Sequence, residues 1–258
     1  MSFNSVLYAI EFFNFIKDKN YDAVIIRGDR YELQALATIA LYKGIPIIHI
    51  EGGDISGAVD NRVRHSITAL ADYHFATNKE SHQRLLTMGV PLDRVWNFGS
   101  LDVEFASKVK LKKLKDKMYM LVAYHGLKSE NPKELDKALK NFKCDIIKIG
   151  GNRDEGVKYG QEEYFPDDYI NLMRGAKVLI GNSSSLIKEA SILPLGVVLV
   201  GDRQTNRLMP RNVVQVPCKA DNILQAILFQ MQSKYEPSDV YYQKDTSKKI
   251  VSKLKEIL

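Results

Sequence analysis

The amino-acid sequence predicts an α/β protein built on two parallel sheets. Short runs rich in β-branched residues alternate with helix-like segments, an order typical of β-α-β units. The alternation stops in the lysine-rich stretch at residues 108–117 and then starts again, which indicates a second sheet. We therefore expect an N-terminal domain at residues 1–107 and a C-terminal domain at residues 108–258 that ends in a terminal helix.

The elements of the two sheets follow one another regularly along the chain. An amphipathic helix is expected at residues 1–20. A signal peptide is not expected there, because Glu11 interrupts the apolar part and no basic segment precedes it. Strands are predicted at residues 22–26, 45–50, 73–77, 94–99, 118–124, 144–149, 177–181 and 196–200. Helices are predicted between them at residues 31–44, 61–71, 79–89, 132–142, 166–176 and 184–194, and a basic helix at 244–258. In such sheets ligands bind at the loops that follow the strands.

Composition excludes several classes of protein. With 258 residues, 45% of them hydrophobic and 26% charged, the chain fits a soluble globular protein. Its apolar runs fall short of the roughly 20 residues that span a bilayer, so we expect no membrane segment and a cytoplasmic location. The two cysteines lack CxxC or metal-ligand spacing, which predicts buried thiols and no disulfide.

The net charge of +6 lies largely in residues 108–117 and in the C-terminal helix. Neither stretch has interleaved aromatic residues, so we expect no nucleic-acid partner. A basic surface does suit an anionic substrate such as a nucleotide.

The clearest ligand signal in the second half is the stretch VLIGNSSSLIKEAS at residues 178–191. Here a strand runs into Asn182, Ser183, Ser184 and Ser185 before a predicted helix, and a helix N-terminus favours a phosphate. Glu189 would lie one helical turn beyond Ser185, where it could accept hydrogen bonds from a ribose diol. The alternative is an ordinary surface glutamate.

Two further loops of the second half carry candidate side chains. Arg203 and Arg207 in GDRQTNR have the planar guanidinium that suits phosphate, although this signal is weak by itself. His125 in AYHG follows the first strand of the second half directly. A structural role for this histidine is the competing interpretation.

In the first half, Asp29, Glu51 and Asp60 follow strands that end at the same edge of the sheet. Three carboxylates beside arginine and histidine residues could divide into an acid, a base and an orienting group. Helix capping by Asp29 and Asp60 is the competing account.

Residues 27–78, 178–191 and 197–207 together resemble the UDP-N-acetylglucosamine 2-epimerase family. The forms EGGDISG and RHSIT resemble its hydrolysing branch, which makes N-acetylmannosamine or a diacetamido analogue for sialic-acid-type pathways. The resemblance implies two Rossmann-like domains of the GT-B type. It also implies that a base removes the C2 proton of a UDP-N-acetylhexosamine, UDP leaves C1 and water adds to the glycal, with no cofactor and no metal.

The resemblance also assigns roles to individual residues. Asp29, Glu51 and Asp60 match the catalytic carboxylates, and His125 matches a histidine near the departing phosphate. The matches in the uridine-diphosphate loop and in the loop after the next strand are Ser184, Ser185, Glu189 and Arg207.

Two departures from the family pattern affect what we expect. Leu186 stands where the family usually has glycine after the serines, so its side chain either crowds the phosphate or turns away. The family's opening strand and Gly/Arg loop have no counterpart here, which predicts a first domain incomplete at its N-terminus and a strand 22–26 with one unpaired edge.

We expect this edge to be covered by a homo-oligomer contact or by a complementing N-terminal fragment. Two other functions stay open from the sequence: a nucleotide-sugar-binding remnant without turnover, and a GT-B glycosyltransferase.

Overall fold

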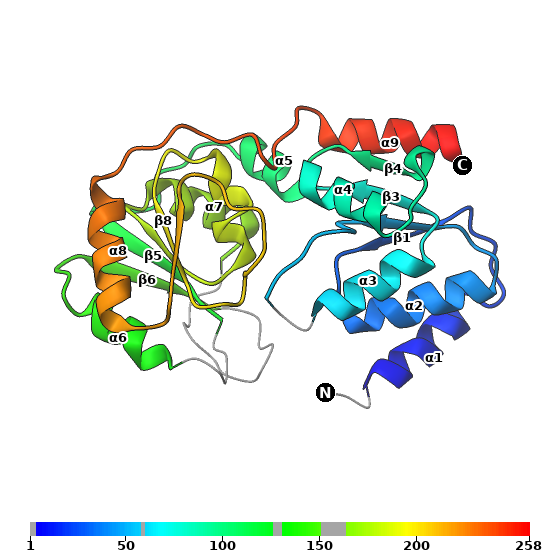
Figure 1. The fold of residues 1–258 in the computed structure, drawn as a ribbon, viewed down its shortest axis with the longest axis horizontal. Coiled ribbons are helices and arrows are strands. Elements are labelled where there is room, and N and C mark those ends of the chain that lie inside the picture. The colour runs from blue at the N-terminus through cyan, green and yellow to red at the C-terminus, as the bar shows by residue number, and fades with distance from the viewer. Residues whose placement is uncertain (1–3, 58–59, 126–130, 151–163) are drawn as a thin grey trace. The chain divides into compact units, whose positions relative to one another are not determined.

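The computed structural model describes residues 4–57, 60–125, 131–150 and 164–258. Their contacts divide the chain into two compact units. The first contains Met1–Leu101, Thr205–Arg207 and Gln243–Leu258, and the second contains Asp102–Gln204 and Leu208–Tyr242. Each unit is an α/β domain with a parallel sheet, as the sequence predicts (Figure 1).

The first unit has a four-stranded sheet in the order β1-β2-β3-β4. Its strands are β1 (Val24–Arg27), β2 (Ile47–Ile50), β3 (Tyr73–Ala76) and β4 (Val95–Asn97). Its helices are α1 (Asn4–Ile16), α2 (Tyr31–Tyr42), α3 (Asp60–Leu70), α4 (Lys79–Thr87), the short 3-10 helix η1 (Leu92–Arg94) and α9 (Thr246–Ile257).

Side chains alternate across this sheet and bury both of its faces. Ile26 and Ile47 pack in an apolar cluster with residues of α2 and α3. Ile48 and Phe75 point to the other face, where Ile250 of α9 packs on them. The C-terminal helix, α9, therefore belongs with the first sheet (Figure 1), and not with the second domain as we expected from the sequence.

Within the described residues, β1 pairs with β2 alone, so its other edge is open. Ile25 on this strand is 52% exposed. Helix α1 packs on α2 and buries Ile16, but it leaves large apolar side chains exposed on several sides, among them Phe13 and Phe15. Large apolar side chains that are exposed together are normally covered by a partner, which agrees with the predicted unpaired edge.

The second unit has a five-stranded parallel sheet in the order β6-β5-β7-β8-β9. Its strands are β5 (Tyr119–Ala123), β6 (Asp145–Ile149), β7 (Leu179–Gly181), β8 (Val197–Val200) and β9 (Val213–Val216). Its helices are α5 (Leu101–Lys108, which begins at the boundary), α6 (Pro132–Leu139), α7 (Pro166–Gly175), α8 (Ala220–Gln232), and the 3-10 helices η2 (Ser184–Leu186) and η3 (Glu189–Ile192).

The chain after β7 differs from the sequence prediction. The helix expected at residues 184–194 is replaced by η2 and η3. The four consecutive residues 185–188 are all buried, whereas a helix with one apolar face would turn at least one of them outward. Leu186 points into the apolar cluster around β5 and β7, so it turns away from the serine loop.

No helix in the described part of the chain is long and apolar enough to cross a bilayer. Cys144 and Cys218 are free thiols, and both are partly buried.

Candidate functional site

The second sheet reverses its direction of growth between β5 and β7. After β5 the chain adds β6 on one side, and later adds β7, β8 and β9 on the other. The loops that leave two such neighbouring strands part from each other, and the crevice between them is the usual ligand site of an open α/β sheet. His125 follows β5, and Asn182 to Ser185 follow β7, so the sequence-predicted residues of the second half lie at this point.

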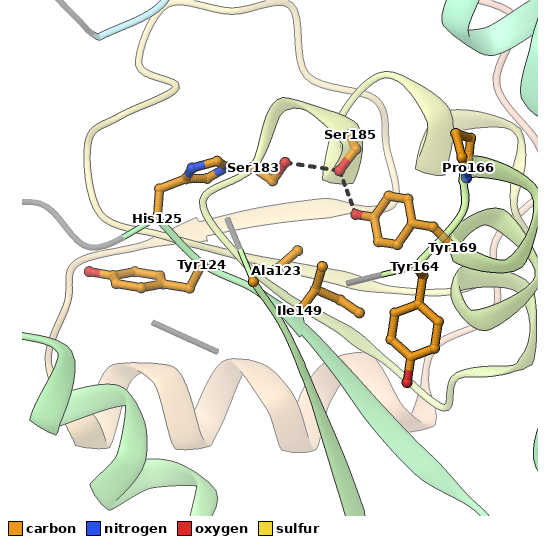
Figure 2. A pocket seen from close by; sticks show the side chains of 10 residues that line it. Ala123, Tyr124, His125, Ile149, Tyr164, Pro166, Tyr169, Ser183 and Ser185 are labelled. Carbon is orange, nitrogen blue, oxygen red and sulfur yellow. Dashed lines mark hydrogen bonds between the residues drawn. The ribbon is translucent and has the colours of Figure 1, made fainter. Parts of the chain in front are cut away.

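A cavity of about 660 Å³ opens there (Figure 2). Its lining residues come from the ends of β5, β6 and β7 and from the start of α7: Ala123, Tyr124, His125, Ile149, Gly150, Tyr164, Pro166, Tyr169, Ser183 and Ser185. Aromatic rings and hydroxyl groups together provide apolar surface and hydrogen-bonding groups, which is the usual composition of a small-molecule pocket.

Three hydroxyl groups form a chain in this cavity (Figure 2). The Tyr169 hydroxyl lies 2.6 Å from Ser185 Oγ, which lies 2.9 Å from Ser183 Oγ. Burial raises the pKa of Tyr169, and the negative charge of Glu189 raises it further, so the phenol stays protonated. Glu189 acts on this cluster although the α-helical turn predicted between it and Ser185 does not form.

Asn182 holds the loop that carries His125, one of the residues that line the cavity. Its side chain is fully buried, accepts from the His125 backbone N–H at 2.7 Å and donates to the His125 carbonyl at 2.9 Å. Its own carbonyl accepts from Arg203 and Gln204, each at 3.1 Å. Asn182 and Arg203, predicted as substrate-binding residues, are therefore seen to hold the backbone of the loops that carry His125 and the serines.

Gly181 explains how β7 comes so close to β5. Its backbone has φ 143°, and a Cβ atom there would lie 2.0 Å from the Ala123 carbonyl oxygen. Any side chain would push apart the two strand ends that carry His125 and the serine loop.

The carboxylates of the first unit lie where its strands end. Glu51 follows β2, and its Oε1 accepts from Arg27 Nε at 2.9 Å and Nη2 at 2.8 Å. Glu51 has φ 71°, a left-handed conformation that is uncommon outside glycine and concentrates at functional sites. Asp29 follows β1 and forms an ion pair with Arg64, which lies on α3.

Helix capping does not account for Asp29, because the N-cap position of α2 is Arg30. Asp60 is the first residue of α3, where a negative charge is favoured by the helix dipole. The helix-terminus interpretation therefore stays open for Asp60.

Arg64, on α3, links the turn after β1 to the turn after β2. Besides Asp29, its guanidinium donates to the Asp54 carbonyl and to Asn61 Oδ1, each at 2.9 Å. Burial is the main cause that lowers the pKa of Arg64 to about 9, and the nearby Arg207 and Arg84 lower it further. Arg64 therefore stays charged at neutral pH and offsets the carboxylate of Asp29 in a buried place.

Asp54 is the buried acid of the same turn. One oxygen accepts from Thr77 Oγ1 at 2.7 Å and from Ser81 Oγ at 2.6 Å. The other lies 3.4 Å from Arg207, which belongs to the first unit by its contacts. Arg84 donates to the Gly53 carbonyl, so side chains of α4 and of the segment before it hold this turn as well.

Asp54 and Arg64 lie in the charge-rich stretch at residues 49–68, but neither they nor Arg84 and Tyr169 were assigned a role from the sequence. The spacing of Asp60, Arg64 and Thr68 at one helical turn each was an available signal, since it places all three on one face of α3. Within the described residues, no group of three or more His, Cys, Asp or Glu side chains could hold a metal ion.

Two parallel-sheet α/β domains of this kind are the building units of the GT-B fold. The family described as UDP-N-acetylglucosamine 2-epimerase matches residues 4–150 and 163–255. The chain belongs to this family.

Three relatives and one solved structure illustrate the similarity. The polysialic acid biosynthesis protein P7 of Escherichia coli is 33% identical over 257 residues, covering 87% of this chain and 66% of that protein. The GDP/UDP-N,N'-diacetylbacillosamine 2-epimerase (hydrolyzing) of Campylobacter jejuni is 33% identical, covering 77% of this chain and 61% of that protein. The UDP-N,N'-diacetylbacillosamine 2-epimerase (hydrolyzing) of Legionella pneumophila is 32% identical, covering 92% and 71%.

The solved structure is that of UDP-GlcNAc 2-epimerase from Neisseria meningitidis bound to UDP-GlcNAc. It is 18% identical with a TM-score of 0.80, and the match covers 98% of this chain and 81% of that one. This chain thus shares the fold, and it spans 61% to 71% of the length of the three relatives above.

Proposed function

We propose that this chain takes part in a hydrolysing 2-epimerase reaction on a UDP-N-acetylhexosamine. A carboxylate removes the C2 proton, and the C1–O bond breaks with its electron pair leaving on UDP, which produces a glycal. Water then adds its oxygen to C1 and a proton returns to C2 from the opposite face. The product is N-acetylmannosamine or a diacetamido analogue.

The observation that carries this proposal is the placement of Asp29 and Glu51. Both follow neighbouring parallel strands, and each is held by an arginine: Asp29 by Arg64 and Glu51 by Arg27. A domain that only binds a nucleotide needs no pair of positioned carboxylates, whereas proton removal and return require them. Family membership supports the same roles.

In this proposal the second unit holds the nucleotide. Ser184, Ser185 and Glu189 bind uridine diphosphate, and His125 lies beside the departing phosphate. Tyr169 and Ser183 complete the hydrogen-bonding wall through their contacts with Ser185. Asp60 and Arg207 are further candidate residues, and both belong to the first unit.

A UDP titration tests the nucleotide site. UDP should raise the melting temperature of the protein, because a ligand that binds only the folded state stabilises it, and free N-acetylglucosamine should not. Ser185→Ala combined with Glu189→Ala should abolish the shift. Ser252→Ala combined with Glu256→Ala makes the same chemical change at the same spacing on the exposed α9, and should keep it. An unchanged UDP shift in the Ser185/Glu189 variant would remove this loop from the site.

A binding function without turnover is the second candidate, and the hydroxyl-lined cavity of the second unit favours it. It predicts the same UDP shift without any release of UDP from a UDP-sugar. The open edge of β1 leads us to propose a partner in either case, a second copy of the chain or a complementing fragment of the family's N-terminal type.

A further inference from the structure

His49 is a fully buried histidine on β2, two residues before Glu51. Its Nε2 lies 2.9 Å from the Gly28 carbonyl oxygen, and its Nδ1 lies 3.1 Å from Thr68 Oγ1. Because a carbonyl only accepts, Nε2 must carry the proton and Nδ1 must accept from the Thr68 hydroxyl. Both ring nitrogens are therefore used, and the ring has one tautomer and one orientation.

The first of these contacts holds the turn that carries Asp29. Gly28 immediately precedes Asp29 and has φ 81°, a left-handed conformation. Its N–H donates to the Ile50 carbonyl at 3.0 Å, and its carbonyl accepts from His49. The Gly28 residue is thus fixed at both polar groups by β2.

The same ring supports the turn that carries Glu51. Gly52 packs so closely on it that a Cβ atom at this position would lie 3.0 Å from His49 Nδ1 and 3.4 Å from Thr68 Oγ1. Glu51 itself has φ 71°, and such a conformation persists only where the surrounding structure enforces it. His49 lies beneath this turn and supplies part of that constraint.

We propose that His49 is a positioning residue that fixes the distance and orientation between Asp29 and Glu51. Its single rigid ring contacts both the turn at Gly28 and the turn at Gly52, whereas His49 itself lies in strand β2. The effect of His49 on turnover rests on the proposed function, whereas its effect on the order of the two turns does not. Burial lowers the pKa of His49, so the ring stays neutral and keeps both hydrogen bonds at working pH.

Hydrogen exchange and turnover together test the proposal. His49→Met removes both hydrogen bonds at similar volume, whereas His49→Gln keeps a donor at the place of Nε2. Backbone amides of residues 28–30 and 51–54 should exchange about fivefold faster in His49→Met, the effect of losing one ordinary hydrogen bond, and close to the wild-type rate in His49→Gln. Ile47→Val, a buried change on the same strand, should leave both turns unchanged.

Turnover should likewise be reduced more in His49→Met than in His49→Gln. We expect kcat for UDP release to fall roughly 10- to 100-fold in His49→Met with the UDP affinity unchanged, because misplaced catalytic groups slow chemistry without loss of nucleotide binding. His49→Gln should recover most of that loss. Thr68→Val removes the hydroxyl that donates to His49 Nδ1, and it serves as the test if His49→Met does not fold. It should show the same local exchange to a smaller degree.

Each outcome separates the two claims. Unchanged exchange at both turns in His49→Met, or equal acceleration in His49→Gln and His49→Met, would overturn the positioning role. Faster exchange at both turns with a wild-type chain that releases no UDP would support the positioning role and count against the proposed function alone.

Discussion

Acid should destabilise the first unit in part through the buried histidine His74. This residue lies on β3 beside His49 and is 1% exposed. Burial is the largest cause that lowers its pKa to about 4, the nearby His49 lowers it further, and a hydrogen bond with the Ala71 backbone only partly opposes them. The unfolded chain has an ordinary histidine pKa of 6.5, so it takes up the proton first as the pH falls.

The sign and size of the effect follow from this difference. The stabilising contribution of neutral His74 is fully present above pH 6.5 and is lost as the pH falls from 6.5 toward 4. The difference between the two pKa values corresponds to roughly 3 kcal/mol of unfolding free energy. This is a large part of the 5–15 kcal/mol or so that typical domains possess.

Urea unfolding followed by Trp96 fluorescence measures this loss of unfolding free energy in the first unit, which contains Trp96. Trp96 is the single tryptophan of the chain, and its ring lies 5.5 Å from Phe75 in the first unit. His74→Gln does not titrate, so the gap in unfolding free energy between it and the wild type should narrow by roughly 3 kcal/mol from pH 7 to pH 4. Ile67→Val, a buried apolar change, should lower stability equally at both pH values. A gap that stays constant in His74→Gln would refute the reasoning.

Two other predictions concern the second unit and the open edge of the first. Asn182→Ala should lower the unfolding free energy of the second unit by about 2 kcal/mol, because it removes the side chain that hydrogen-bonds to both polar groups of the His125 backbone. A loss of less than a few tenths of a kcal/mol in urea unfolding would contradict this. The chain alone should self-associate at micromolar concentration by light scattering coupled to size exclusion, and Ile25→Lys should reduce this by placing a charge on the β1 edge. A compact monomer in the wild type would show that the edge needs no cover.

The parallel-sheet architecture was predictable because strand signals are local. The run at residues 45–50 contains β2, and the run at 177–181 contains β7, since β-branched residues bounded by turns mark a buried strand. The partner sheet of α9 was not predictable, because an amphipathic helix pattern shows which face is apolar and not what covers it. The irregular η2–η3 segment followed from core packing around Leu186, which overrides the helix pattern.

Within the site, residues that follow strands were the easier part to find. Asp29, Glu51, His125 and the serines were chosen for their positions at strand ends, and the structure places them there. Arg64 and His49 were missed because their partners lie 35 and 21 residues away in the sequence. Asn182 shows the converse difficulty, since an asparagine side chain can bind a ligand or hold a loop. Its contacts show that it holds the loop, and its predicted role in substrate binding stays a prediction.

Deuterium incorporation at C2 of the sugar is the measurement that tests the proposed reaction most directly. The protein is incubated with UDP-N-acetylglucosamine, or its diacetamido analogue, in deuterium oxide. We expect free UDP together with one deuterium at C2 of the released sugar, because the proton that returns to C2 comes from solvent. Glu51→Gln should slow this roughly 10²- to 10⁴-fold, and Glu236→Gln, at an exposed acid, should not. Binding of UDP without release of UDP or deuterium at C2, or full turnover in Glu51→Gln, would contradict the proposed chemistry.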